Sequence, residues 1–173
     1  RNKKIFILDI GTGTGCILIS LLSDMPNSKG VGIDISKKAI SVAEKNLKKH
    51  RMTNNIKFIN KSLNSKFNQK FDLIVSNPPY VKRNEIKNLR DDVKRYEPLI
   101  ALDGGNDGLD LIKKVIYKAE SILKLKGTLA LEIGNEQFKK VSEKLKKKNF
   151  KIEQIIKDYK DNVRCIISTY IGK

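Results

Sequence analysis

The chain has 173 residues, of which 39% are hydrophobic and 32% are charged, a balance typical of one globular domain with a substantial core. No apolar run approaches the roughly 18 residues that cross a bilayer, and no secretory signal opens the chain, so we expect a cytoplasmic protein with no membrane partner. The first residue is Arg1 rather than Met, from which we expect a fragment of a longer protein.

The formal net charge of +17 has two explanations. A polyanionic partner, such as ribosomal or transfer RNA, would favour a strongly basic surface. An AT-rich genome would instead enrich Lys, Asn and Ile, which are all abundant here. Because the lysines are scattered over helix faces, we favour the second explanation and keep weak contact with RNA or the ribosome as the alternative.

Cysteine and histidine are too scarce for several common chemistries. Cys16 and Cys165 are isolated, lack the spacing of metal ligands, and are expected in packed positions in a reducing compartment. The only histidine, His50, falls at the solvated end of a helical pattern. We therefore expect neither a metal site nor a hydrolase that needs a catalytic histidine.

The first predicted unit is a strand, a turn and a helix. Residues 5–10 are apolar except for Asp9, residues 11–15 form a glycine-rich turn, and a helical periodicity then runs until Pro26. This order is typical of the first half of a nucleotide-binding βαβ unit, because glycines let the backbone approach a ligand and the helix N-terminus offers free N–H groups.

The spacing of the turn distinguishes between cofactors. A dinucleotide fingerprint needs glycine at the sixth position from Gly11, where this chain has Cys16. The pattern present, D-x-G-x-G-x-G, resembles the first motif of class I S-adenosylmethionine-dependent methyltransferases. The resemblance implies S-adenosyl-L-methionine as cofactor. The residues that it assigns to cofactor binding are Asp9, Gly11, Thr12, Gly13, Thr14 and Gly15.

An acidic residue ends the second predicted strand, residues 30–34. Asp34 follows the glycine turn by about 20 residues, the spacing at which a carboxylate takes the ribose hydroxyls of a nucleotide. Ser36 directly precedes the next helical pattern and is the better N-cap. We therefore expect Ser36 to cap that helix and Asp34 to be free for the ribose.

The third predicted strand, residues 56–59, is followed by a departure from the methyltransferase pattern. An acidic residue usually stands after this strand and holds the adenine amino group, but here the sequence is Lys61-Ser62-Leu63. A serine hydroxyl can still accept one hydrogen bond. We expect Ser62 and Leu63 to lie near the adenine.

The fourth predicted strand runs straight into Asn77-Pro78-Pro79-Tyr80. The two prolines end the strand because they cannot donate to a sheet ladder. The tetrapeptide resembles a methyltransferase motif that acts on planar nitrogens, and the resemblance implies that the Asn77 side-chain oxygen and the Pro78 carbonyl each accept one N–H of that nitrogen. Pro79 and Tyr80 would shape its slot, to which Tyr80 offers a flat face. Asn77 is also expected to border the cofactor.

This tetrapeptide resembles the catalytic motif of methyltransferases that modify planar nitrogens, namely adenine N6, guanine N2 or glutamine N5. Four later segments, at residues 95–98, 104–109, 131–134 and 157–164, are R-Y-E-P, G-G-N-D-G-L, L-E-I-G and K-D-Y-K-D-N-V-R. Their ordered set is similar to the release-factor glutamine N5-methyltransferase family (HemK/PrmC) over essentially the whole chain.

The resemblance implies methyl transfer to the glutamine side-chain nitrogen in the Gly-Gly-Gln loop of class I peptide-chain release factors. The residues implied in catalysis are Asn77, Pro78 and Tyr80. Pro79 and Glu97 join them in substrate binding; Glu97 belongs to the long polar loop 81–102, whose length is typical of a lid or substrate-binding segment. Residues 1–173 would be the catalytic domain, without the upstream helical domain that the family normally carries.

The fold class expected is α/β, a doubly wound and mostly parallel sheet. The residues alone indicate four or five parallel strands, the fifth at 127–134, then a helix after residue 135 and a closing hairpin formed by 151–156 and 164–170. The resemblance implies seven strands, with the last antiparallel.

Two other functions stay open. The first is an adenine-N6 or guanine-N2 methyltransferase acting on nucleic acid; the charge of +17 favours it, and the absence of a separate target-recognition region opposes it. The second is a non-catalytic module that kept the fold. Ser62 favours this reading, and the intact residues 77–80 oppose it.

Overall fold

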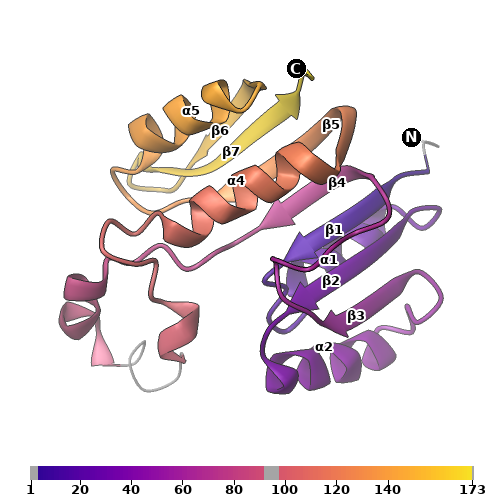
Figure 1. Cartoon of the computed structure of the whole chain (residues 1–173). Coiled ribbons are helices and arrows are strands. Elements are labelled where there is room, and N and C mark those ends of the chain that lie inside the picture. The colour runs from indigo at the N-terminus through magenta and orange to yellow at the C-terminus, as the bar shows by residue number, and fades with distance from the viewer. Residues whose placement is uncertain (1–3, 92–97, 173) are drawn as a thin grey trace.

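The computed structural model describes residues 4–91 and 98–172, in which seven strands form one sheet (Figure 1). The strand order is β3-β2-β1-β4-β5-β7-β6. Strands β1 to β5 pair in parallel, and β7 is antiparallel to both β5 and β6. The expected seven-stranded, mostly parallel sheet with an antiparallel last strand is thus confirmed. The strands are β1 Phe6–Ile10, β2 Lys29–Asp34, β3 Ile56–Asn60, β4 Phe71–Ser76, β5 Leu123–Glu132, β6 Phe150–Lys157 and β7 Val163–Tyr170.

Helices cover both faces of this sheet. They are α1 Cys16–Asp24, α2 Lys37–Lys49, α4 Asp110–Ile122 and α5 Phe138–Lys147, with short 3-10 helices η1 Arg83–Asn88 and η2 Leu99–Ala101. Leu8 and Ile10 of β1 belong to the core that α4 and α5 cover, whereas Ile7 belongs to the core of α1 and α2. Parallel strands buried on both faces must be apolar along most of their length, which explains the nearly continuous apolar runs in the sequence.

The ends of the first two helices test several sequence predictions. The Ser36 Oγ accepts the backbone N–H of Ala39 at 3.2 Å, so the N-cap of α2 is confirmed. His50 is the exposed C-cap of the same helix, as expected. The packed position expected for Cys16 is wrong, because this first residue of α1 faces solvent; Cys165 in β7 is half-buried.

Strand β5 begins earlier than its apolar pattern suggested. Leu123 directly follows α4 and pairs with Phe71, and the register then shifts, so that Thr128 is the next residue paired with β4. Lys126 lies in this irregular stretch at a φ of 62°. The predicted strand at 127–134 therefore missed the first residues of β5, since polar bulge residues hide the pairing of Leu123.

The connection between strands creates a switch point at the centre of the sheet. From β1 the chain proceeds outward through β2 and β3, and it then returns to β4 on the other side of β1. Ile10 and Ser76, the last residues of β1 and β4, are register partners, and the Ser76 Oγ donates to the Ile10 carbonyl at 2.8 Å. In open α/β sheets ligands bind at such a point, beyond the carboxyl ends of the strands.

Candidate active site

The loop that follows β1 has a backbone that only glycine adopts easily. Gly11, Gly13 and Gly15 have φ values of 71°, 55° and 81°. A Cβ on Gly15 would lie 2.5 Å from the ring of Phe58, so Gly15 is required for close packing as well. A Cβ on Gly11 or Gly13 would meet nothing within 4 Å. This side of the loop is therefore open to a ligand that approaches the backbone.

Asp9 lies beneath this loop and is completely buried. Its Oδ2 accepts the Thr12 hydroxyl at 2.6 Å, and its Oδ1 has no hydrogen-bond partner within residues 4–91 and 98–172. Burial raises the pKa of Asp9 to about 6; the Thr12 hydroxyl opposes this shift and the negative charge of Asp34 adds to it. An unpaired buried carboxylate oxygen fits a positively charged ligand such as S-adenosylmethionine.

Asp34 ends β2 beside the same loop. Its Oδ2 accepts the Gly13 N–H at 3.0 Å, and its Oδ1 accepts the Ser36 N–H at 2.8 Å. The expectation that Asp34 is free therefore needs correction, because it also orders the start of α2. Each carboxylate oxygen has a second lone pair, so the side chain can still accept ribose hydroxyls.

Ser62 and Leu63 follow β3 at the carboxyl edge of the sheet. The Ser62 Oγ accepts the Asn64 N–H at 3.2 Å within a short turn and is exposed. Leu63 is buried in the core that α4 covers. The serine hydroxyl thus keeps its own proton available for a ligand, whereas most of the leucine side chain is used in packing.

The segment that follows β4 begins where the glycine loop begins, because Ile10 and Ser76 are register partners. Asn77 is exposed, and its side-chain amide has no hydrogen-bond partner among the described residues. Pro78 is buried, and Pro79 is half-buried. An unpaired amide oxygen at a rigid strand end is available for a substrate N–H.

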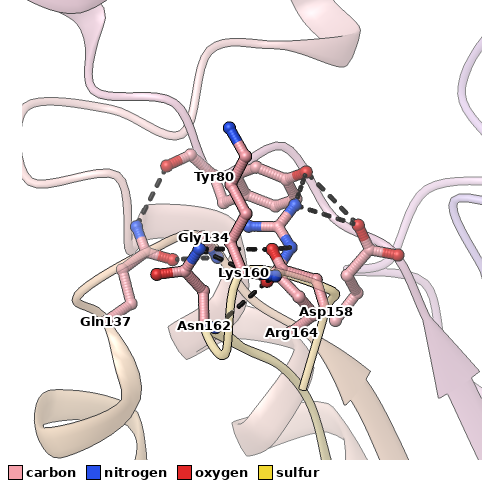
Figure 2. A network of polar contacts seen from close by, with 8 residues as sticks. Tyr80, Gly134, Gln137, Asp158, Lys160, Asn162 and Arg164 are labelled. Carbon is pink, nitrogen blue, oxygen red and sulfur yellow. Dashed lines mark hydrogen bonds and ion pairs between the residues drawn. The ribbon is translucent and has the colours of Figure 1, made fainter. Parts of the chain in front are cut away.

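Tyr80 is held by side chains from the far half of the sheet (Figure 2). Its hydroxyl accepts the Arg164 Nη2–H at 2.7 Å and donates to the Glu132 Oε1 at 3.2 Å. The Arg164 guanidinium also lies over the ring, 5.2 Å from its centre. Burial, and then the charge of Glu132, raise the pKa of Tyr80, so the phenol stays protonated near neutral pH.

The backbone of Tyr80 is held as firmly as its ring. The Gln137 Nε2 donates to the Tyr80 carbonyl at 3.0 Å and to the Gly108 carbonyl at 3.2 Å, while the Gln137 Oε1 accepts the Gly134 N–H at 2.8 Å. Figure 2 shows this buried amide reaching toward the backbone of Tyr80. Our sequence analysis gave Glu132, Gln137 and Arg164 no functional role.

The chain beyond Tyr80 is tied to the glycine-rich segment at 104–109. Val81 donates to the Leu102 carbonyl at 3.1 Å and accepts from the Gly104 N–H at 2.8 Å. Leu99 and Ile100 of η2 are 68% and 62% exposed at the end of the long loop. The expected substrate residue Glu97 lies outside the described residues.

No described helix is long and apolar enough to cross a membrane. Within residues 4–91 and 98–172, no cluster of three or more His, Cys, Asp or Glu side chains could hold a metal ion.

A doubly wound sheet with an open glycine loop at its switch point is typical of α/β proteins that bind nucleotides. The family model described as "Methyltransferase domain" matches residues 1–169. The chain belongs to this methyltransferase-domain family.

Curated relatives agree with the resemblance found in the sequence. The release factor glutamine methyltransferase of Fusobacterium nucleatum is 44% identical over 164 residues, which are 94% of this chain and 46% of that protein. The bifunctional methyltransferase of Rickettsia typhi is 42% identical over 161 residues, or 92% of this chain and 31% of that protein. The chain thus spans about half of the first relative and a third of the second.

Solved structures agree with the fold. The ribosomal protein L11 methylase of Lactobacillus delbrueckii superposes with a TM-score of 0.70 at 21% identity, covering 96% of this chain and 70% of that one. Magnesium protoporphyrin IX methyltransferase from Synechocystis, solved with bound SAM, superposes with a TM-score of 0.67 at 16% identity. The match covers 98% of this chain and 71% of that one.

Proposed function

We propose that this chain transfers the methyl group of S-adenosylmethionine to the side-chain amide nitrogen of a glutamine in class I peptide-chain release factors. The observation that carries the proposal is the free Asn77 amide beside the buried Pro78, one strand away from the open glycine loop. The relatives named release factor glutamine methyltransferase, 36–44% identical, support glutamine as the acceptor.

The cofactor residues have separate tasks in this proposal. The loop at residues 11–15 borders the methionine and ribose end, above the buried charge of Asp9. Asp34 accepts the ribose hydroxyls with its remaining lone pairs. Ser62 and Leu63 border the adenine from the end of β3. When bound, S-adenosylmethionine supplies an electrophilic methyl group on a positively charged sulfur.

The acceptor is the harder half of the reaction, because an amide nitrogen has a delocalised lone pair and is a poor nucleophile. The Asn77 Oδ1 and the Pro78 carbonyl each accept one N–H of the substrate amide, which fixes the nitrogen and lets it pyramidalise toward the methyl carbon. The methyl group would pass to this nitrogen with S-adenosylhomocysteine as the leaving group, and the methylated nitrogen would then lose one proton to solvent. Tyr80 and Pro79 form the slot that holds the amide plane and excludes water.

We further propose that residues 1–173 act as the catalytic domain of a longer cytoplasmic enzyme. The partial coverage of the relatives supports this, since they extend well beyond the matched segment.

The test is methyl transfer from radiolabelled S-adenosylmethionine to purified release factor, with total RNA and DNA in parallel reactions. We expect label on the release factor, and its loss when the glutamine of the Gly-Gly-Gln loop is replaced by alanine. Label on nucleic acid alone would overturn the proposal in favour of a base methyltransferase, the function that the charge of +17 favours. The chain is tested alone and with its upstream sequence restored.

A further inference from the structure

Tyr80 lies beside two segments that are distant from it in the sequence, at residues 132–137 and at Arg164, and both contribute to its position. Its hydroxyl contacts Glu132 at the end of β5 and Arg164 in β7, and its backbone carbonyl contacts Gln137 just before α5. Such a residue can present its face to a substrate in only one orientation.

We propose that Arg164, Glu132 and Gln137 are positioning residues for methyl transfer, which act by locking Tyr80 into one wall of the acceptor slot. The inference rests on the proposed function, in which Tyr80 contacts the substrate amide. It assigns a mechanistic task to residues that do not themselves reach the reacting atoms.

The Tyr80 ring is fixed because its hydroxyl both accepts one hydrogen bond and donates another. The bond from Arg164 is short, at 2.7 Å, and charge-assisted, and the phenol proton is directed to Glu132. Arg164 and Glu132 lie 3.8 Å apart, with side chains only 30% and 34% exposed, so neither partner is easily replaced by water. The phenol is therefore a structural donor, and we exclude it as the base that takes the amide proton.

Arg164 is itself oriented by the turn between β6 and β7. Its Nε lies 3.9 Å from the Asp158 Oδ2. Asp158 also accepts the backbone N–H groups of Lys160 and Asn162, at 2.9 and 3.0 Å, so its carboxylate shapes the turn (Figure 2). The turn within residues 157–164 therefore has a structural role, because it orients Arg164 toward the Tyr80 hydroxyl.

The contacts around the Tyr80 backbone depend on two glycines. A Cβ on Gly108 would lie 2.5 Å from the Tyr80 carbonyl oxygen and 2.6 Å from the Gln137 Nε2. A Cβ on Gly134 would lie 3.0 Å from the Tyr80 ring. The segments at 104–109 and 131–134 therefore approach Tyr80 more closely than any side chain would permit, and Gln137 joins their backbones.

The experiment compares Arg164→Met, Arg164→Lys, Tyr80→Phe and the double variant Tyr80→Phe/Arg164→Met in methyl transfer to the release factor. We expect Arg164→Met to lower kcat on the order of 100-fold, because a displaced wall misaligns the nitrogen. The dissociation constant of S-adenosylhomocysteine and the Tm should change little. Arg164→Lys should restore part of kcat, and the double variant should be no slower than the slower single variant. Arg51→Met, an exposed site after α2, controls for the lost charge.

A second measurement does not need turnover. Ultraviolet difference titration against Tyr80→Phe reports the pKa of the Tyr80 phenol among the five tyrosines. Glu132→Gln should lower that pKa, and Arg164→Met should raise it, because the first removes a negative neighbour and the second a positive one. If neither variant changes the pKa of the Tyr80 phenol, or if the kcat losses of the single variants multiply in the double variant, the positioning role is disproved. If wild type labels no release factor but the titration behaves as expected, the proposed substrate fails and the positioning role stands.

Discussion

At the scale of single residues, the most unusual group is the carboxylate of Asp9. It is completely buried, one of its oxygens has no partner among the described residues, and its pKa is raised from 3.8 to about 6. The fold therefore compensates the charge of this carboxylate only in part, through the Thr12 hydroxyl. This cost is reasonable at a site where a cationic ligand completes the interactions.

The Asp9 carboxylate makes stability depend on pH. Because the folded pKa lies above the unfolded one, the folded protein binds more protons between pH 4 and pH 6, and its free energy of unfolding falls as pH rises through this window. Two pKa units correspond to about 3 kcal/mol. We expect the free energy of unfolding of Asp9→Asn, measured in urea without cofactor, to rise relative to that of wild type by about 3 kcal/mol as the pH goes from 4 to 6.5.

The control for this prediction is Asp24→Asn, at the exposed end of α1. Because this side chain is exposed, Asp24→Asn controls for the loss of one negative charge. A difference between Asp9→Asn and wild type that stays constant over this pH window would contradict the assigned shift.

Asn77 offers a second prediction at this scale. Its amide is exposed and unpaired among the described residues, so removing it breaks no hydrogen bond within residues 4–91 and 98–172. We expect Asn77→Ala to fold normally and to bind S-adenosylhomocysteine, and to lose kcat on the order of 100-fold because the acceptor nitrogen is no longer aligned. Calorimetric titration and initial rates measure the two quantities.

The matched control is Asn27→Ala, an exposed asparagine between α1 and β2 at the opposite edge of the sheet. Its turnover should equal that of wild type. Unchanged turnover for Asn77→Ala would remove Asn77 from the mechanism.

At the scale of elements, the N-cap of α2 lies beside Asp34, the candidate ligand of the cofactor ribose. Ser36 caps the helix through Ala39, and Asp34 joins the same turn by accepting the Ser36 N–H. We expect Ser36→Ala to lower the free energy of unfolding by about 1 kcal/mol, as measured in urea. The exposed Ser41 within α2 is the control, because Ser41→Ala removes no cap and should be neutral or slightly stabilising. Equal effects at both positions would contradict the capping role.

The elements also show how far the sequence could predict the structure. Apolar runs located the strands that are buried on both faces, and the D-x-G-x-G-x-G turn and the two prolines after β4 marked the strand ends that form the site. The first residues of β5 were missed, because Lys124 and Lys126 interrupt the apolar pattern where the strand bulges. Cys16 was misplaced, since its helical position does not reveal which side faces solvent.

Gln137 could not be identified for a different reason. One polar residue after a strand carries no periodic signal, and its importance arises only because the backbones of Tyr80, Gly108 and Gly134 meet around it in three dimensions. Arg164 and Glu132 lay inside segments that resembled the family, but sequence order does not reveal that both reach one phenol. Contacts between distant segments are thus the part of the site that needed the structure.

At the scale of the whole molecule, the two halves of the sheet contribute different parts of the site. The β1–β2 half provides the glycine loop and Asp34, and the β5–β7 half provides the side chains that hold Tyr80. Strand β4 lies between them and carries Asn77 at its end. In the proposed function, the switch point would bring together a half that binds the cofactor and a half that holds the acceptor, which suits a reaction between two substrates.

The net charge of +17 belongs to the whole molecule as well, and it permits a last test of the acceptor. Scattered lysines bind a polyanion without sequence preference, and such binding falls steeply with salt because counterions are released. We expect binding to transfer RNA, followed by fluorescence anisotropy, to weaken by orders of magnitude between 50 and 200 mM salt. Methylation of the release factor should fall far less over the same range, and ribonuclease should leave it unchanged, since in the proposed function Asn77, Pro78 and Tyr80 hold a neutral amide. Parallel losses of RNA binding and methylation would instead indicate that the basic surface serves the reaction.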